Sequence, residues 1–255
     1  QGCVANMYAG NPICCLTNPF LGHEAEPIAK TENPKKVMVI GGGVAGLCAA
    51  FIAKEKGHEV TLYEAGDVLG GNMRLAAYPP GKGDITNMIR SYIHRCQKDG
   101  VKIVMNCEVT PELIKEEKPD SVIIATGSKT LILPIEGIDN PAIIHGSDLL
   151  DGKRPAGKKV LVVGGGMVGC ETAAFLGEQE HDVTVIEFRD TVGADVIHEH
   201  RVYLMKDFED YGIKEITGAK VCKFYEDGVE YETADGVRHE TRGYDSVILS
   251  MGFRN

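Results

Sequence analysis

The sequence predicts an α/β protein built from two similar parallel-sheet units, because one order of elements occurs twice along its 255 residues. In each copy, a short apolar run rich in β-branched residues leads into three glycines, a segment with helical spacing and a second apolar run ending in glutamate. The spacing repeats as well, because Gly41 to Glu64 and Gly164 to Glu187 are both steps of 23 residues (64 − 41 and 187 − 164). Strands without charge are typical of parallel sheets that are covered on both faces.

The first copy follows a segment of different character. Residues 1–34 show neither helical nor strand periodicity and are rich in Pro, Gly and Asn, so we expect a loop and linker there. The chain then predicts a strand at 37–41, a helix at 44–57 and a strand at 59–64. A helix at about 84–100 and an apolar strand at 121–127 complete the first copy.

The second copy repeats these elements and adds one. Its expected elements are strands at 159–163, 182–187 and 246–252 and helices at 167–179 and 196–212. Asp-Gly pairs at 227–228 and 235–236 separate alternating strands, which predicts a small inserted antiparallel meander. We therefore place a first domain at 35–140 and a second at 141–255.

Composition limits the classes of partner and location. The chain has 27 basic and 37 acidic residues and a formal charge of −10, which argues against nucleic acid or an anionic membrane as partner. The uncharged run 37–53 is shorter than the roughly 20 residues that span a bilayer, and its consecutive glycines would weaken a helix. Eight cysteines without the spacing of a disulfide scaffold favour a reducing compartment, so we expect a cytoplasmic protein.

The two glycine-rich turns have the chemistry of dinucleotide cradles. In G-x-G-x-x-G the first glycine permits a tight turn, the second lets a pyrophosphate approach the backbone, and the third lets helix and strand pack closely. Helix N-terminal N–H groups then hold the phosphates, and the acid at the end of the next strand accepts from ribose hydroxyls. The residues in these roles are Gly41, Gly43, Gly46 and Glu64 in the first copy and Gly164, Gly166, Gly169 and Glu187 in the second. Two dinucleotides on one duplicated chain indicate electron transfer between a nicotinamide and a flavin.

The segments IGGGVAGLCAAFIAKEKGHEVTLYEAGDVLGGNMR, ATG at 125–127, VVGGGMVGCETAAFLGEQ and SVILSMGFRN resemble the glutathione-reductase-type fold. That resemblance implies two Rossmann-like domains, with FAD in the first and NAD(P)H in the second. It also implies that Gly71 and Arg74 lie near the flavin pyrophosphate, and that Ala125, Thr126 and Gly127 end the strand where the chain leaves the flavin domain. By the same resemblance Glu171 lies near the nicotinamide. Its alternative is a solvated first-turn acid favoured by the helix dipole.

The acid at the end of the second domain's second strand bears on the choice of nicotinamide. A carboxylate at Glu187 would repel a 2′-phosphate and hydrogen-bond a 2′-hydroxyl, which favours NADH. Arg189, two residues later, could instead turn toward a 2′-phosphate. We expect NADH as the reductant.

The spacing of the cysteines limits which subfamily of these flavoproteins the chain can resemble. No two of them are three or five residues apart, which argues against a redox-active disulfide. Cys3 and Cys15, twelve apart (15 − 3) and followed by LTNPFLGHE, resemble the tail of the C-x2-C-x3-C-x11-C motif that binds a [4Fe–4S] cluster. That motif belongs to multidomain relatives of old yellow enzyme, such as 2,4-dienoyl-CoA reductase, 2-enoate reductase and trimethylamine dehydrogenase. The alternative is an ordinary loop with adventitious thiols.

This resemblance implies a larger protein. In that family an FMN-bearing TIM barrel comes first, then the cluster motif, then a module like this one. We therefore expect a fragment, truncated at both ends, whose head is a loose, metal-free tail because two cysteines cannot hold a cluster that needs four ligands.

The expected function is an electron-input module. NADH would reduce FAD, and in the intact protein electrons would pass through [4Fe–4S] to FMN, where an activated C=C bond of a small-molecule substrate is reduced. No residue of this chain is expected to be catalytic, because the cofactors carry the chemistry. The alternative is a non-catalytic, ADP-binding structural or docking domain, as in the trimethylamine dehydrogenase branch.

Overall fold

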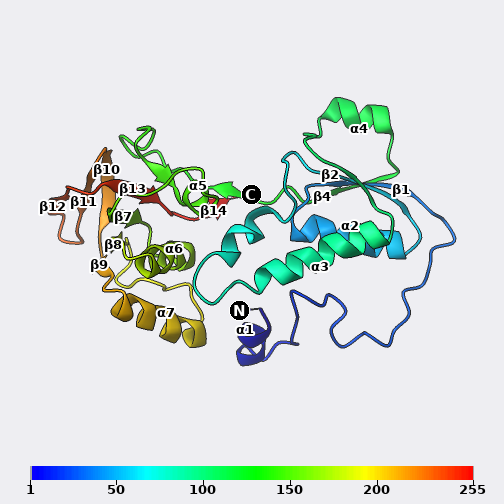
Figure 1. Ribbon diagram of the computed structural model, residues 1–255, viewed down its shortest axis with the longest axis horizontal. Coiled ribbons are helices and arrows are strands. Elements are labelled where there is room, and N and C mark those ends of the chain that lie inside the picture. The colour runs from blue at the N-terminus through cyan, green and yellow to red at the C-terminus, as the bar shows by residue number, and fades with distance from the viewer. Residues whose placement is uncertain (1, 255) are drawn as a thin grey trace. The chain divides into compact units, whose positions relative to one another are not determined.

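The computed structural model describes residues 2–254, which fold into two compact units (Figure 1). The first unit comprises residues 2–77 and 82–127, and the second comprises 78–81 and 128–254. Each unit has its own parallel sheet and its own hydrophobic core. The predicted α/β class with two parallel sheets and a small antiparallel meander is confirmed.

The first unit is a four-stranded parallel sheet in the order β3-β2-β1-β4. Its strands are β1 Lys36–Ile40, β2 Glu59–Tyr63, β3 Lys102–Val104 and β4 Ser121–Ile124, and its main helices are α2 Val44–Glu55, α3 Ile85–Lys98 and α4 Pro111–Glu117. Helices α2 and α3 pack their apolar side chains on one face of the sheet, with Phe51 and Tyr92 in edge-to-face contact. Helix α4 lies on the other side of the sheet (Figure 1).

The N-terminal segment differs from the loose loop that the sequence predicts. Residues Gly2–Tyr8 form a short helix, α1. Beyond it, the hydroxyl of Tyr92 on α3 donates to the Leu16 carbonyl at 2.6 Å, and the guanidinium of Arg95 lies 5.5 Å from the centre of the Phe20 ring. The sequence missed these contacts because each comes from a residue more than 70 positions away, and seven residues are too few to show a helical period.

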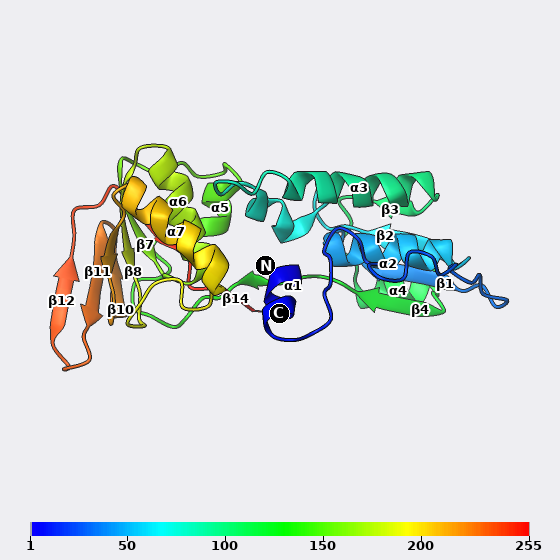
Figure 2. The same cartoon turned by 90° about the horizontal axis from the view of Figure 1, so that it is seen from below.

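The second unit is a five-stranded parallel sheet in the order β6-β13-β7-β8-β9. Its strands are β6 Ile144–His145, β7 Lys159–Val163, β8 Asp182–Ile186, β9 Lys214–Ile216 and β13 Ser246–Leu249. Helices α5 Gly146–Leu150, α6 Met167–Glu178 and α7 His198–Asp210 pack on one face. The antiparallel meander β10 Lys220–Tyr225, β11 Gly228–Glu232 and β12 Arg238–Thr241 covers the other, so that the sheet lies between helices and meander (Figure 2).

The border between the units lies earlier than the predicted 140/141. Residues 128–140 belong to the second unit, where β5 Lys129–Thr130 pairs with β14 Phe253–Arg254. Ile135 and Ile138 pack on the core beneath the meander, and the Phe224 amide donates to the Glu136 carbonyl at 2.7 Å. The partners of this stretch lie more than 80 residues further along the chain, so local sequence patterns do not reveal them.

Both sheets place a glycine turn at the same topological point. The central strand β1 pairs with β2 on one side and β4 on the other, and β7 pairs in the same way with β8 and β13. The chain thus leaves each central strand where the strand order reverses, and ligands of open α/β sheets bind at such a point.

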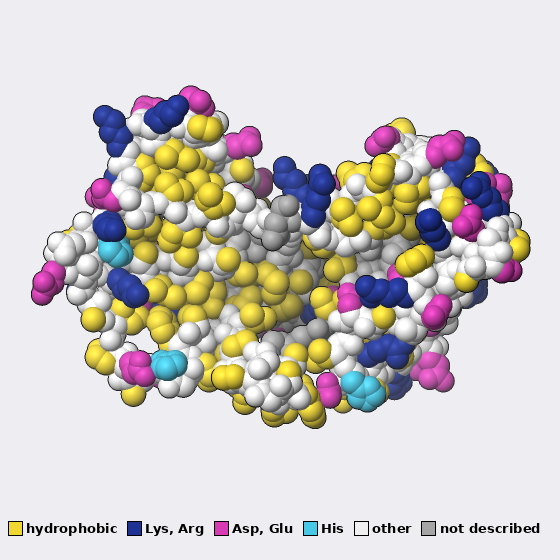
Figure 3. Space-filling view, turned by 180° about the vertical axis from the view of Figure 1, so that it is seen from behind, with side chains coloured by type: hydrophobic (Ala, Val, Ile, Leu, Met, Phe, Trp, Pro, Cys, Tyr) yellow, Lys and Arg dark blue, Asp and Glu magenta, His cyan; other side chains and the backbone are white. Residues whose placement is uncertain are grey.

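Within residues 2–254, no helix has the length and apolar character needed to cross a membrane. On the face shown in Figure 3, acidic and basic side chains are interspersed rather than gathered by sign.

Candidate functional site

In the first unit, the glycine turn brings strand and helix into direct backbone contact. Gly41 has φ +107°, and a Cβ there would lie 2.3 Å from the Ala125 carbonyl oxygen. A Cβ on Gly46 would lie 1.9 Å from the Gly41 carbonyl oxygen. Real Cβ atoms do not approach that closely, so both positions require glycine and the N-terminus of α2 sits directly against the ends of β1 and β4.

Gly43 differs from both because the space beside it is open. It is the N-cap of α2, with φ −70° and ψ 176° and no side-chain cap. The nearest atom to a Cβ built there is the Gly71 Cα, at 3.9 Å. A phosphate could therefore approach the unmatched N–H groups at the start of this helix.

The second glycine pair forms the opposite wall of this cradle. The Gly70 amide donates to the Gly42 carbonyl at 2.8 Å, and a Cβ on Gly71 would lie 3.1 Å from the Gly43 Cα. Gly70 and Gly71 both have positive φ (+109° and +55°), and they are the N-cap and first residue of a short 3-10 helix, Gly71–Met73, whose C-cap is Arg74. The structure thus places Gly71 against Gly43, and the Arg74 side chain lies beside Gly70, 3.0 Å from a Cβ built there.

The predicted ribose acid is fixed by the glycine turn itself. Glu64 accepts from the Gly42 amide at 2.6 Å with Oε2 and from the Gly66 amide at 2.7 Å with Oε1. A carboxylate has about four lone-pair sites, so it retains capacity for ribose hydroxyls. Beside it, Ala125 continues β4 by donating to the Ile40 carbonyl at 2.8 Å, while Thr126 and Gly127 (φ +72°) are exposed where the chain leaves the unit.

The second unit repeats this geometry. Gly164 has φ +105°, and a Cβ there would lie 2.4 Å from the Ser250 carbonyl oxygen; one on Gly169 would lie 1.7 Å from the Gly164 carbonyl oxygen. Glu187 accepts from the Gly165 amide at 2.6 Å and from the Arg189 amide at 3.0 Å. Gly166 is the N-cap of α6, again without a side-chain cap of its own.

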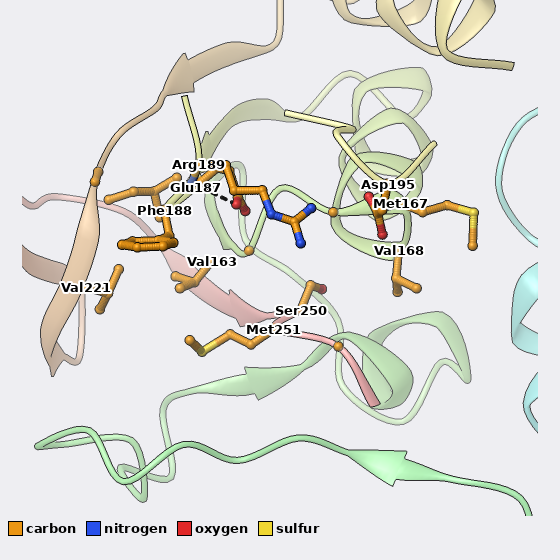
Figure 4. A pocket seen from close by; sticks show the side chains of 15 residues that line it. Val163, Met167, Val168, Glu187, Phe188, Arg189, Asp195, Val221, Ser250 and Met251 are labelled. Atoms are coloured by element: carbon orange, nitrogen blue, oxygen red, sulfur yellow. Dashed lines mark hydrogen bonds between the residues drawn. The ribbon is translucent and has the colours of Figure 1, made fainter. Parts of the chain in front are cut away.

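A cavity of about 300 Å³ opens at this second turn (Figure 4). Its lining includes Gly164, Gly166, Glu187, Arg189, Asp195 and Ser250. The Arg189 side chain extends across the cavity toward its centre, and Phe188 points toward Val221 of the meander (Figure 4). The cavity therefore has both a negatively charged side chain, Glu187, and a positively charged one, Arg189, beside the end of β8.

Among the lining residues that the sequence did not predict, two are polar, Ser250 and Asp195. Ser250 occupies the position of Ala125, next to the first glycine of its turn; its side chain is buried and its hydroxyl has no partner among the described residues. Asp195 accepts from the Met167 amide at 2.9 Å at the start of α6. The only available signal for either was the alignment of the two copies, which sets Ser250 against Ala125 and Asp195 against Asn72.

Glu171 is not the solvated first-turn acid of the alternative interpretation. It is only 7% exposed, and its Oε1 lies 3.2 Å from Nε2 of His200 on α7. It does not line the cavity at the glycine turn. A pairing with a residue 29 positions away has no signature in the local sequence.

The predicted metal ligands lie in the N-terminal segment. Cys3 is exposed on α1, and Cys15 is half-buried, with its Sγ accepting from the Asn18 amide at 3.3 Å. Amide donors, first that of Asn18, hold the pKa of the Cys15 thiol below its usual value. Within residues 2–254, no three His, Cys, Asp or Glu side chains are grouped so that they could hold a metal ion.

Comparisons with known proteins place the chain among flavin- and nicotinamide-dependent reductases. Residues 35–255 match the family model described as pyridine nucleotide-disulphide oxidoreductase. The whole chain is 34% identical to the bilirubin reductase of Mediterraneibacter gnavus, covering 40% of that protein, and 99% of it is 34% identical to the cinnamate reductase of Clostridium sporogenes, covering 38%. A solved complex of 2-naphthoyl-CoA reductase with 2-naphthoyl-CoA matches 99% of the chain with a TM-score of 0.91 and 34% identity, over 39% of its own length. The chain thus spans about two fifths of the relatives that it matches.

Proposed function

The chain belongs to the pyridine nucleotide-disulphide oxidoreductase family, and on that premise we propose that it transfers hydride from NADH to FAD as the electron-input part of a larger reductase. The observation that carries this proposal is the pair of matching cradles, one in each unit, each with a glycine at the helix N-cap and a glutamate held by backbone amides. A flavin accepts hydride from a nicotinamide without a protein acid or base. The side chains of this chain therefore bind and orient.

The first cradle takes FAD. The α2 N–H groups beside Gly43 and Gly71 hold the pyrophosphate, Arg74 adds a positive charge, and Glu64 accepts from the ribose hydroxyls. The end of β4, at Ala125, Thr126 and Gly127, borders the same space. The open space at Gly43 supports this fit, because a side chain there would fill it.

The second cradle takes the nicotinamide dinucleotide. Its phosphates approach the N-terminus of α6 at Gly166, Gly169 lets that helix pack on the turn, and Glu187 accepts from the adenosine ribose. NADH is preferred to NADPH because a 2′-phosphate would meet the negative charge of Glu187. Glu171 acts near the nicotinamide end, with His200 fixing its position.

The rest of the reaction lies in the longer protein that the relatives' lengths indicate. In that protein Cys3 and Cys15 would be two of the four ligands of a [4Fe–4S] cluster, which would supply one-electron transfer toward an FMN in a TIM barrel. Amide donation to the Cys15 sulfur supports a ligand role, because it stabilises the thiolate that binds metal. The substrate is a small molecule with an activated C=C bond, in line with the cinnamate and 2-naphthoyl-CoA of the relatives' names, and the protein is cytoplasmic.

The test is anaerobic reduction of the purified, FAD-loaded protein. NADH should bleach the flavin absorption band, and NADPH should do so only at much higher concentration. A flavin band that stays unbleached with both nucleotides would overturn the proposal. Co-purification of colourless ADP in the first cradle would instead support a structural nucleotide-binding domain.

A further inference from the structure

The two cradles share a second loop as well as the glycine turn. Gly70 and Gly193 each follow the first glycine of their unit by 29 residues (70 − 41 and 193 − 164). Each donates its amide to the carbonyl of the second glycine: Gly70 to Gly42 at 2.8 Å, and Gly193 to Gly165 at 2.7 Å. The loops are therefore equivalent in sequence position and in their contact with the cradle.

The side chains that these equivalent loops carry differ in charge. Two positions after the shared glycine, the first loop has Asn72 and the second has Asp195. Four positions after it, the first has Arg74 and the second has Ile197. Relative to the loop of the first cradle, this loop of the second has gained a negative charge and lost a positive one.

Asp195 lies where an anion would bind. Its Oδ1 accepts from the Met167 amide at 2.9 Å, and its two carboxylate oxygens lie 3.3 and 3.4 Å from a Cβ built on Gly166. Figure 4 shows Asp195 beside Met167 at the edge of the cavity. In the first cradle, the corresponding space beside Gly43 contains only the Gly71 Cα within 4 Å.

The loop that carries Asp195 is held in place from α7. Arg201 donates through Nη2 to the Thr191 hydroxyl at 2.7 Å and to the Val192 carbonyl at 3.1 Å. Together with the bond from Gly193 to Gly165, these contacts fix both the start of the loop and its distance from the glycine turn. The carboxylate thus stays within reach of the α6 N-terminus.

We propose that Asp195 occupies the place of a dinucleotide phosphate at the N-terminus of α6 and so weakens the second cradle relative to the first. The inference rests on the proposed function, because it assigns the second cradle to an exchanging NADH. A phosphate that enters must displace the carboxylate from the Met167 amide or bind beside its negative charge, and both weaken binding. The dinucleotide in the second cradle is then released readily.

The experiment measures binding to the FAD-loaded protein, so that added nucleotide reports on the second cradle. ADP-ribose, which contains the pyrophosphate, and adenosine, which lacks it, are titrated calorimetrically into wild type and Asp195→Asn. Asparagine copies Asn72 and retains an oxygen acceptor for the Met167 amide. Asp190→Asn serves as the matched control. It removes the same charge from the same β8–α7 connection, but Asp190 does not line the cavity.

At low ionic strength, Asp195→Asn should bind ADP-ribose about tenfold more tightly, and salt should reduce this gain. Adenosine binding and the Asp190→Asn control should be unchanged. An ADP-ribose affinity that is unchanged or lower in Asp195→Asn would overturn the inference, while NADH binding by the wild type would leave the proposed function standing. Binding of neither NADH nor ADP-ribose to any variant would overturn both. Asp195→Ser, another neutral acceptor, provides the measurement if the asparagine variant folds poorly.

Discussion

Gly43→Ala should separate folding from flavin binding. The backbone at Gly43 (φ −70°, ψ 176°) is extended and open to any residue, and the nearest atom to the new Cβ is 3.9 Å away. The protein itself therefore has room for the methyl group. The same methyl group fills the space through which a pyrophosphate would reach the α2 N–H groups.

The two effects differ in magnitude. For folding, alanine at an N-cap costs up to about 1 kcal/mol relative to glycine, and the lower entropy of the unfolded chain returns about 0.4–1 kcal/mol. The free energy of unfolding should therefore change by less than about 1 kcal/mol. For binding, the loss of two hydrogen bonds to charged phosphate oxygens, at about 1.5–3 kcal/mol each, weakens FAD by about 10²- to 10⁴-fold.

The assay pairs urea unfolding with FAD titration of the apoprotein. Gly83→Ala is the control, because Gly83 also has negative φ and no atom within 4 Å of a Cβ, yet lies outside the cradle. Gly46→Ala is the contrasting variant, because its Cβ would lie 1.9 Å from the Gly41 carbonyl oxygen and should destabilise the fold. If Gly43→Ala bound FAD as tightly as Gly83→Ala, the first cradle would not be a pyrophosphate site.

Three further outcomes are expected. Ser250→Ala, which copies Ala125, should leave the unfolding free energy unchanged but weaken NADH binding about fivefold, since its buried hydroxyl has no partner within residues 2–254 and is available to the ligand. Equal NADH affinity in titration would contradict this. Cys15 should react with iodoacetamide at lower pH than Cys48, because amide donors lower the pKa of Cys15 while burial raises the pKa of Cys48. The two pH profiles are measured by mass spectrometry, and the reverse order would count against the N–H···S bond at Cys15. Tyr92→Phe should lower the free energy of unfolding by about 1 kcal/mol, because it removes the hydrogen bond from the Tyr92 hydroxyl to the Leu16 carbonyl. Proteolysis of residues 9–30 should also become faster. An unaltered cleavage rate would show that other contacts hold this segment.

The backbone of both cradles could be predicted from the sequence because only glycine fits at the positions where strand and helix are in contact. The contacts of Gly41 with Ala125, and of Gly46 with Gly41, exclude any side chain, so the residue type reports the geometry directly. The same holds for Gly164 and Gly169. Apolar runs predicted the parallel strands for a similar reason, since burial on both faces excludes charge.

Side chains that reach the cradles from elsewhere could not be predicted in this way. Asp195 and Ser250 are ordinary residues in their local segments, and their roles arise from contacts 28 or more residues away. The N-terminal segment is similar, because Leu16 and Phe20 are held by Tyr92 and Arg95 of α3. Such residues can be found from the sequence only by comparing the two copies, at positions where the backbone is equivalent but the side chains differ.

Those differences bear on how one fold could serve two cofactors with opposite kinetic needs. If NADH binds at about 10⁶ M⁻¹s⁻¹ and its product must leave at about 10 s⁻¹ in each turnover, the dissociation constant must be about 10 μM or weaker. A flavin that stays for a day at the same association rate needs about 10 pM, a gap of about 8 kcal/mol. The glycine turns cannot produce that gap, because their backbone geometry is the same in both units. The difference in affinity must come from the side chains around the turns. Where the first loop has Asn72 and Arg74, the second has Asp195 and Ile197. Both differences disfavour an anion in the second cradle, as a weaker NADH site requires.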